Sequence, residues 1–156
     1  MSKEILITLI EGGRGSLERT AQAVPEDKLQ WRPLDNGRTV LDLLGDAAQV
    51  PGMVVKMLES RGEFKPSREA FQQMAQERAD WTREDALQHL TQNTERLIVL
   101  MRAMSDEQLE QPLHLPMGGG ITMPLGGWIM MTYRTFCSRM GQINYIQTLY
   151  GDFESH

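Results

Sequence analysis

The sequence predicts an all-α protein built as a bundle of four long helices. Apolar residues recur at helical spacing in four long segments, while the polar–apolar alternation typical of strands is scarce. Apolar residues make up 40% of the 156-residue chain and charged residues 24%, which are ordinary values for a globular domain. A chain of this length can bury a substantial core. We therefore expect one domain over residues 1–151 and a C-terminal tail at residues 152–156.

The first helix is expected over residues 2–23, although three glycines interrupt its pattern. Gly12, Gly13 and Gly15 each cost up to about 1 kcal/mol of helix stability relative to alanine. They indicate either a bend or a close contact with another helix. The prolines and the Asn-Gly pair within residues 25–37 then predict an irregular connection to the second helix.

The second helix is expected to begin near Thr39, because Thr39 and Asp42 resemble a capping box. Pro51 is expected to kink this helix, since it removes a backbone donor and crowds the preceding turn. Asp46 lies close to the apolar face of the helix. Buried carboxylates are rare unless they are paired or bind a metal, so Asp46 is either a flank residue that reaches solvent or part of a site.

Shorter elements separate the second, third and fourth long helices, so the connections between helices 2 and 3 and between helices 3 and 4 are long. A short helix is expected over residues 67–76, and Thr82 with Asp85 is expected to cap the third long helix. Ser105 begins a further helical turn. The glycine-rich segment over residues 112–127 is expected to be a loop, and it lacks the Gly-Lys-Ser/Thr ending of a phosphate-binding loop.

The last helix is expected over residues 124–150, and its apolar stripe is interrupted by polar residues. Thr135, Arg139 and Gln142 fall in the middle of that stripe, which consists of Trp128, Met131, Ile146 and Leu149. Burying an unpaired polar group costs roughly 1–3 kcal/mol, so three of them together indicate a site. The alternative is an ordinary core edge, where Thr135 bonds a backbone carbonyl and Arg139 extends to water.

The remaining chemically active side chains give weaker signals. His89 is expected on the exposed side of its helix, His114 in the loop and His156 at the C-terminus, so no two histidines have the spacing of a helical metal site. Cys137 and Ser138 have no histidine near them in sequence that could act as a base, and no catalytic residue is assigned.

The charge and the lone cysteine restrict the partners and the compartment that we expect. A formal net charge of −5 disfavours non-specific binding to nucleic acid or to an anionic membrane. No stretch approaches the roughly 18 apolar residues that a membrane-spanning helix needs. One cysteine cannot form an internal disulfide, so a reducing, cytoplasmic environment is expected.

Three segments together resemble a known family. They are VPEDKLQWRP at residues 24–33, TVLDLLGD at residues 39–46, and Gly141-Gln142-Ile143 with Gly151 at the end of the last helix. In order and spacing they resemble the DinB-like, or YfiT-like, superfamily of bacterial four-helix bundles. The resemblance implies a bundle of 1-2-4-3 order, often dimeric, in which three histidines bind a divalent metal such as zinc or nickel. Members with assigned activities include transferases and isomerases that use bacillithiol or mycothiol.

At the positions of the three histidines, the resemblance places Asp46, Thr135 and Arg139. A threonine hydroxyl is a poor metal ligand, and arginine stays protonated and repels a cation. We therefore expect no metal and no cofactor, with an Asp46–Arg139 ion pair in place of the metal. Together with Gln142, these residues would line a pocket for a small molecule, which Arg139 could hold by a carboxylate.

The expected function is therefore that of a metal-free small-molecule binding or interaction module, or of a dimeric bundle of unassigned role, and catalysis is left open. The homodimer is expected by family analogy. The alternative is a thiol S-transferase or hydrolase with an altered metal site that recruits Asp46 and a loop histidine such as His114.

Overall fold

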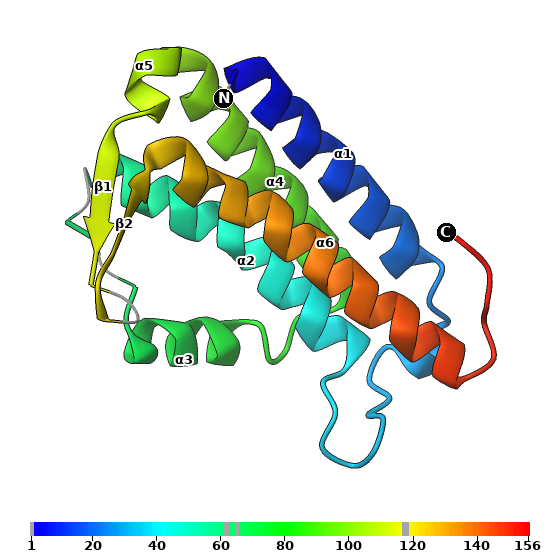
Figure 1. The fold of residues 1–156 in the computed structure, drawn as a ribbon. Coiled ribbons are helices and arrows are strands. Elements are labelled where there is room, and N and C mark those ends of the chain that lie inside the picture. The colour runs from blue at the N-terminus through cyan, green and yellow to red at the C-terminus, as the bar shows by residue number, and fades with distance from the viewer. Residues whose placement is uncertain (1, 61–62, 65, 117–118) are drawn as a thin grey trace.

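The computed structural model describes residues 2–60, 63–64, 66–116 and 119–156, in which four long helices form a bundle (Figure 1). The long helices are α1 (Lys3–Gln22), α2 (Val40–Glu59), α4 (Arg83–Ala103) and α6 (Leu125–Leu149). The short helices are η1 (Glu26–Lys28), α3 (Arg68–Glu77) and α5 (Asp106–Leu109). The prediction of a four-helix bundle is confirmed. Within the described residues, none of the helices is long and apolar enough to cross a membrane.

The helices are ordered differently around the bundle from the order that the family resemblance implied. α1 packs against α4 and α6, and α2 packs against the same two helices, so α1 and α2 occupy opposite corners. In numbers of the long helices this order is 1-4-2-3, and the expected 1-2-4-3 order is wrong. The connection over residues 23–39 is long enough to cross the end of the bundle, so α2 does not have to pack beside α1.

The expected loop over residues 112–127 is instead a β-hairpin followed by the start of α6. Strands β1 (Pro112–Leu115) and β2 (Ile121–Pro124) pair antiparallel, with Leu113 opposite Met123. The indole N–H of Trp128 donates to the carbonyl of Leu113 at 3.0 Å and ties the hairpin to α6. Four-residue strands are too short to show a clear alternating pattern in the sequence, which explains the wrong prediction.

Side-chain caps account for several helix N-termini. Thr39 accepts a hydrogen bond from the backbone N–H of Asp42, as expected of an N-cap, but the Asp42 carboxylate bonds arginines and does not complete a capping box. The full capping box at Thr82 and Asp85 is confirmed. In α1, a Cβ at Gly13 would lie 2.9 Å from the ring of Tyr133, so this glycine marks a close contact with α6.

The core face of α6 is rotated from the stripe expected from the sequence. Its buried residues are Trp128, Ile129, Thr132, Phe136, Ile143, Ile146 and Gln147. Leu149 is 44% exposed, and Met131 is only partly buried. Thr135, Arg139 and Gln142 therefore lie along the edge of the buried face, where polar groups of the same helix can reach both a neighbouring helix and solvent.

Candidate functional site

An ion pair between α2 and α6 forms the centre of the candidate site. The Nε atom of Arg139 donates to Oδ2 of Asp46 at 2.6 Å. The side chains are 24% and 21% exposed respectively, so the contact is largely shielded from solvent. Nη1 of Arg139 also donates to Oε1 of Gln142 at 2.9 Å, one turn further along α6. The structure thus contains the predicted contact between Asp46 and Arg139, and Gln142 contacts the same guanidinium.

A second carboxylate, Asp42, extends the cluster along α2. Asp42 and Asp46 are four residues apart, so they lie on the same side of the helix. Oδ2 of Asp42 accepts from Nε of Arg38 at 2.6 Å, and Oδ1 accepts from Nε of Arg78 at 2.8 Å. Both arginines also approach Asp46, at 3.6 Å for Arg38 and 3.7 Å for Arg78. We call Arg38, Asp42, Asp46, Arg78 and Arg139 the arginine–aspartate cluster.

Arg78 connects this cluster to α3 through Gln49. Its side chain is only 10% exposed, and its Nη1 donates to Oε1 of Gln49 at 3.1 Å. The amide nitrogen of Gln49 in turn donates to the carbonyl of Met74 in α3 at 2.9 Å. A largely buried guanidinium is stable here because acidic and amide oxygens surround it.

Contacts within the cluster shift the pKa values of Asp42 and Arg38 in favour of their charged forms. Burial alone would raise the pKa of the Asp42 carboxyl, but hydrogen bonds from Arg38 and Arg78 outweigh it and hold that pKa below its usual value. Burial would likewise lower the pKa of Arg38, and its contacts with Asp42 and Asp46 raise it instead. With three guanidiniums facing two carboxylates, the cluster has a formal charge of +1.

These residues do not fit a divalent metal. Across the described part of the chain, no group of three or more His, Cys, Asp or Glu side chains is arranged to hold an ion. Of the residues at the three family positions, Asp46 is the one whose side chain is a common metal ligand, and its carboxylate accepts a hydrogen bond from Arg139 at 2.6 Å. A cation entering there would displace a guanidinium and meet two more, at Arg38 and Arg78, so the local charge opposes its binding.

Thr135 lies outside the hydrogen-bonded cluster. Its hydroxyl donates to the carbonyl of Met131, one turn back in α6, at 2.8 Å. This is the alternative that the sequence left open for Thr135, in which its hydroxyl bonds a backbone carbonyl. A threonine hydroxyl within a helix reaches this carbonyl without leaving its preferred rotamer, so no partner from another helix is needed.

The three histidines are not brought together with the cluster. The ring of His89 stacks on Trp81 at a centroid distance of 4.1 Å with an interplanar angle of 6°. The residue is partly buried, so the expectation of an exposed surface residue is wrong. His114 contacts Thr122 across the hairpin at 2.8 Å, and His156 contacts Asp152 at 2.9 Å. Each imidazole thus has a local neighbour of its own.

A cavity of 430 Å³ opens beside the cluster, between the 33–38 segment and α6. Arg38 and Gln142 contribute its polar groups, and Leu43 and Ile146 contribute apolar surface. The carbonyl oxygen of Gln142 accepts from Arg139, so its NH₂ group can donate to a ligand. The cavity therefore offers a guanidinium and an amide donor next to an apolar surface, which suits a small anion with a hydrocarbon part.

Sequence reasoning missed three members of this arrangement, namely Arg38, Asp42 and Arg78. Asp42 was assigned to helix capping, and Arg38 and Arg78 lie outside the long helices. One signal was available in the sequence: Arg38, Asp42 and Asp46 are spaced by four residues, which places an arginine and two aspartates on one helical side. Nothing in the local sequence places Arg78 there, because its contact with Asp42 spans 36 positions.

Comparison with known proteins identifies the family. A sequence model of the DinB superfamily matches residues 9–134, which is most of the chain. The chain therefore belongs to the DinB superfamily. The matched range includes Asp46 and ends before Thr135 and Arg139. None of the curated proteins that were compared matches the chain.

Solved structures with the same fold are distant in sequence. A mycothiol-dependent maleylpyruvate isomerase has 18% identity and a TM-score of 0.76, over 92% of this chain and 61% of its own. The chain thus spans about 61% of that enzyme's length. YfiT from Bacillus subtilis, a probable metal-dependent hydrolase with an unusual four-helix bundle topology, has 16% identity and a TM-score of 0.78, over 97% and 90%. The colibactin self-resistance protein ClbS, solved with double-stranded DNA, has 18% identity and a TM-score of 0.72, over 94% and 96%.

Proposed function

We propose that this DinB superfamily protein binds a small carboxylate-bearing molecule without a metal, and that the Asp46–Arg139 pair takes the place of the metal. The observation that carries the proposal is the 2.6 Å contact between Nε of Arg139 and Oδ2 of Asp46. This contact supplies a fixed positive charge at the position where relatives, by resemblance, hold a cation. The carboxylate of Asp46 is therefore neutralised from within the chain.

The chemistry of the neighbouring cavity supports a carboxylate ligand. The arginine–aspartate cluster has one more positive than negative charge, and Arg38 and Gln142 face the cavity of 430 Å³. A guanidinium has five N–H donors, and the contacts of Arg38 with Asp42 and Asp46 do not use all of them. A carboxylate between Arg38 and the amide NH₂ of Gln142 would accept from both, and its hydrocarbon part would cover Leu43 and Ile146.

A calorimetric titration with hexanoate and its uncharged analogue hexanamide tests this function. We expect hexanoate to bind the wild-type protein at least about tenfold more tightly than hexanamide, because only the carboxylate pairs with Arg38. Arg38→Met should remove that preference, while Arg32→Met, a matched change in the same connection, should keep it. Equal binding of the two compounds, or an Arg38→Met variant that still prefers hexanoate, would contradict the proposal.

The competing function is that of a metal-dependent, thiol-using transferase or hydrolase. It is favoured by the mycothiol-dependent isomerase and by YfiT, which share the fold. On this chain it would require Asp46 and a histidine such as His114 to supply ligands, although His114 contacts Thr122 in the hairpin. Activity with a thiol that depends on added zinc and is lost in Asp46→Asn would favour this function over ours.

We further infer that the protein acts as a homodimer in the cytoplasm and does not bind nucleic acid. An apolar surface supports self-association: Leu34, Tyr145 and Leu149 line one cavity of 690 Å³ and are 92%, 66% and 44% exposed. The net charge of −5 opposes DNA binding, even though ClbS was solved with DNA. Comparing the sedimentation of wild type with that of Tyr145→Glu tests the dimer. Salt-dependent retention of the protein on a DNA column would contradict the proposal that it does not bind nucleic acid.

A further inference from the structure

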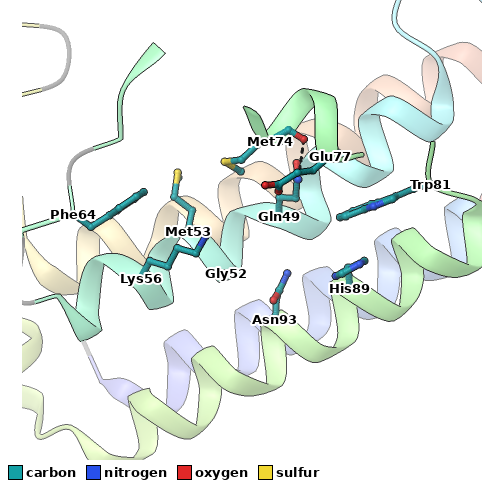
Figure 2. Close-up of a pocket in the computed structure, with 10 residues that line it drawn as sticks. All are labelled: Gln49, Gly52, Met53, Lys56, Phe64, Met74, Glu77, Trp81, His89 and Asn93. Carbon is teal, nitrogen blue, oxygen red and sulfur yellow. Dashed lines mark hydrogen bonds between the residues drawn. The ribbon is translucent and has the colours of Figure 1, made fainter. Parts of the chain in front are cut away.

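A separate cavity of 150 Å³ lies between α2, α3 and α4 (Figure 2). None of its lining residues belongs to the arginine–aspartate cluster. Two of its sides are apolar: Met53 and Phe64 lie toward one end, and Met74 projects from α3. Trp81 lies at the other end, stacked on His89. Methionine and aromatic side chains together adapt well to a flat apolar molecule, because thioether sulfurs and ring faces both attract aromatic rings.

The size of this cavity suits one small ring. A dry apolar cavity of roughly 150 Å³ in another protein accommodates benzene. Gly52 helps to maintain the space, since a Cβ there would lie 3.1 Å from Oδ1 of Asn93. Asn93 is held in place because its amide nitrogen donates to the carbonyl of Ala48 at 2.9 Å. The cavity is therefore bounded on the α4 side by a fixed polar edge.

Glu77 and Lys56, the acidic and basic side chains that line the cavity, differ in their contacts within the protein. Glu77 accepts a hydrogen bond from Gln73 at 3.2 Å. The Lys56 ammonium, in contrast, has no hydrogen bond or ion pair with any other residue that the structure describes, and the Lys56 side chain lies along the cavity beside Met53 (Figure 2). A cation without an internal partner at an apolar cavity favours a ligand that carries a negative charge.

α3 forms one wall of the cavity and is weakly attached to the bundle. None of its residues is buried, and Phe71 on this helix is 42% exposed. The hydrogen bond from Gln49 to the carbonyl of Met74 holds it over the cavity. An element with so few buried contacts opens at low free-energy cost, which gives a ligand a path into the cavity.

From these observations we infer that the cavity under α3 is a second ligand site, for a small aromatic carboxylate. The ring would lie among Met53, Met74 and the Trp81–His89 stack, and the carboxylate would pair with Lys56. This site uses other residues than the proposed Arg38–Gln142 site, so the two can be tested separately.

Titration of the full-length protein with benzoate, followed by NMR of the tryptophan indole protons, tests this site. Trp81 reports on the cavity, whereas Trp31 and Trp128 lie elsewhere in the fold, and Trp81→Phe assigns the signal. We expect a saturable shift of the Trp81 signal with benzoate and a Kd about tenfold higher in Lys56→Met. Benzyl alcohol should bind wild type and Lys56→Met alike.

Two controls separate this site from the first and from a loss of folding. Lys28→Met removes another lysine, which lies beside Asp27 and Tyr150, and should leave the benzoate affinity unchanged. Arg38→Met should leave the Trp81 response intact, so a failure of the first site does not count against the second. Absence of a saturable Trp81 shift, or equal benzoate affinity in wild type and Lys56→Met, would overturn the inference.

Discussion

Arg139 and Asp46 are 93 positions apart in the chain, and the guanidinium Nε of one lies 2.6 Å from the carboxylate Oδ2 of the other. This contact joins α6 to α2 at the edge of the bundle core. Both side chains are more than three-quarters shielded from solvent. Because neither group could remain there unpaired at low cost, the contact couples the packing of two helices to the charge balance of the candidate site.

Removing the guanidinium should expose this coupling as a loss of stability. Arg139→Met leaves the Asp46 carboxylate with the longer contacts to Arg38 and Arg78, at 3.6 and 3.7 Å. We expect the free energy of unfolding to fall by about 1–3 kcal/mol, less than for a fully buried pair because both side chains retain some exposure. Urea denaturation at neutral pH measures the change.

The double variant Asp46→Leu with Arg139→Met should recover much of that loss, because it leaves no unpaired charge. Arg134→Met is the matched control on α6, since Arg134 is exposed and contacts the sulfur of Met131. Its effect should stay within about 0.5 kcal/mol. If Arg139→Met changed the free energy of unfolding as little as this control, the ion pair would not contribute to stability.

Arg78 should be the most sensitive member of the cluster. It is 10% exposed and bonds both Asp42 and Gln49. We expect Arg78→Met to cost about 2–4 kcal/mol, and Arg78→Lys to restore little, because an ammonium cannot match the directions of two guanidinium bonds. Arg68→Met, an exposed change in α3, is the control. Full stability of Arg78→Lys would argue that only the charge matters.

The cluster also predicts how stability depends on pH. The folded-state pKa of Asp42 lies below its usual value, so its contribution is complete above the unfolded-state pKa of about 3.9 and is lost as pH falls through the folded-state pKa. We expect Asp42→Asn to be less stable than wild type at pH 6 and the difference to shrink below about pH 4. A constant difference from pH 6 to pH 2.5 would contradict this assignment.

Adjacent glycines in α1 offer a test of the packing between α1 and α6. A Cβ at Gly12 meets nothing within 4 Å, so Gly12→Ala should stabilise the protein by about 0.5–1 kcal/mol. A Cβ at Gly13 would lie 2.9 Å from the Tyr133 ring, so Gly13→Ala should gain nothing or destabilise. Thermal melts of the two variants measure this, and equal gains would show that Tyr133 does not constrain the contact.

The fold was predictable from the sequence where it depends on local signals, and not where it depends on contacts between distant segments. The helices were predictable because apolar spacing and caps such as Thr82 with Asp85 are local signals. The hairpin was not, because each strand has four residues and its stability depends on Trp128 bonding Leu113. The 1-4-2-3 order was also hidden, since apolar faces do not specify which helices become neighbours.

The candidate site shows the same division between local and distant contacts. The Asp46–Arg139 pairing was predictable because a charge near an apolar face needs a partner and the family resemblance placed both residues together. Thr135 follows the alternative that the sequence left open, because its hydroxyl is satisfied within its own helix. Arg78 could not be found, since its position over Asp42 and Gln49 depends on how the segment after α3 folds back onto α2.

The metal content of the protein tests the central claim most directly. Protein purified without chelator should be exposed to equimolar zinc or nickel, desalted and analysed by inductively coupled plasma mass spectrometry. We predict far less than one ion per chain, and the same unfolding free energy with and without a chelator, because guanidiniums surround the carboxylate of Asp46. One ion per chain that is lost in Asp46→Asn would show that the ion pair gives way to a metal, and would contradict the account.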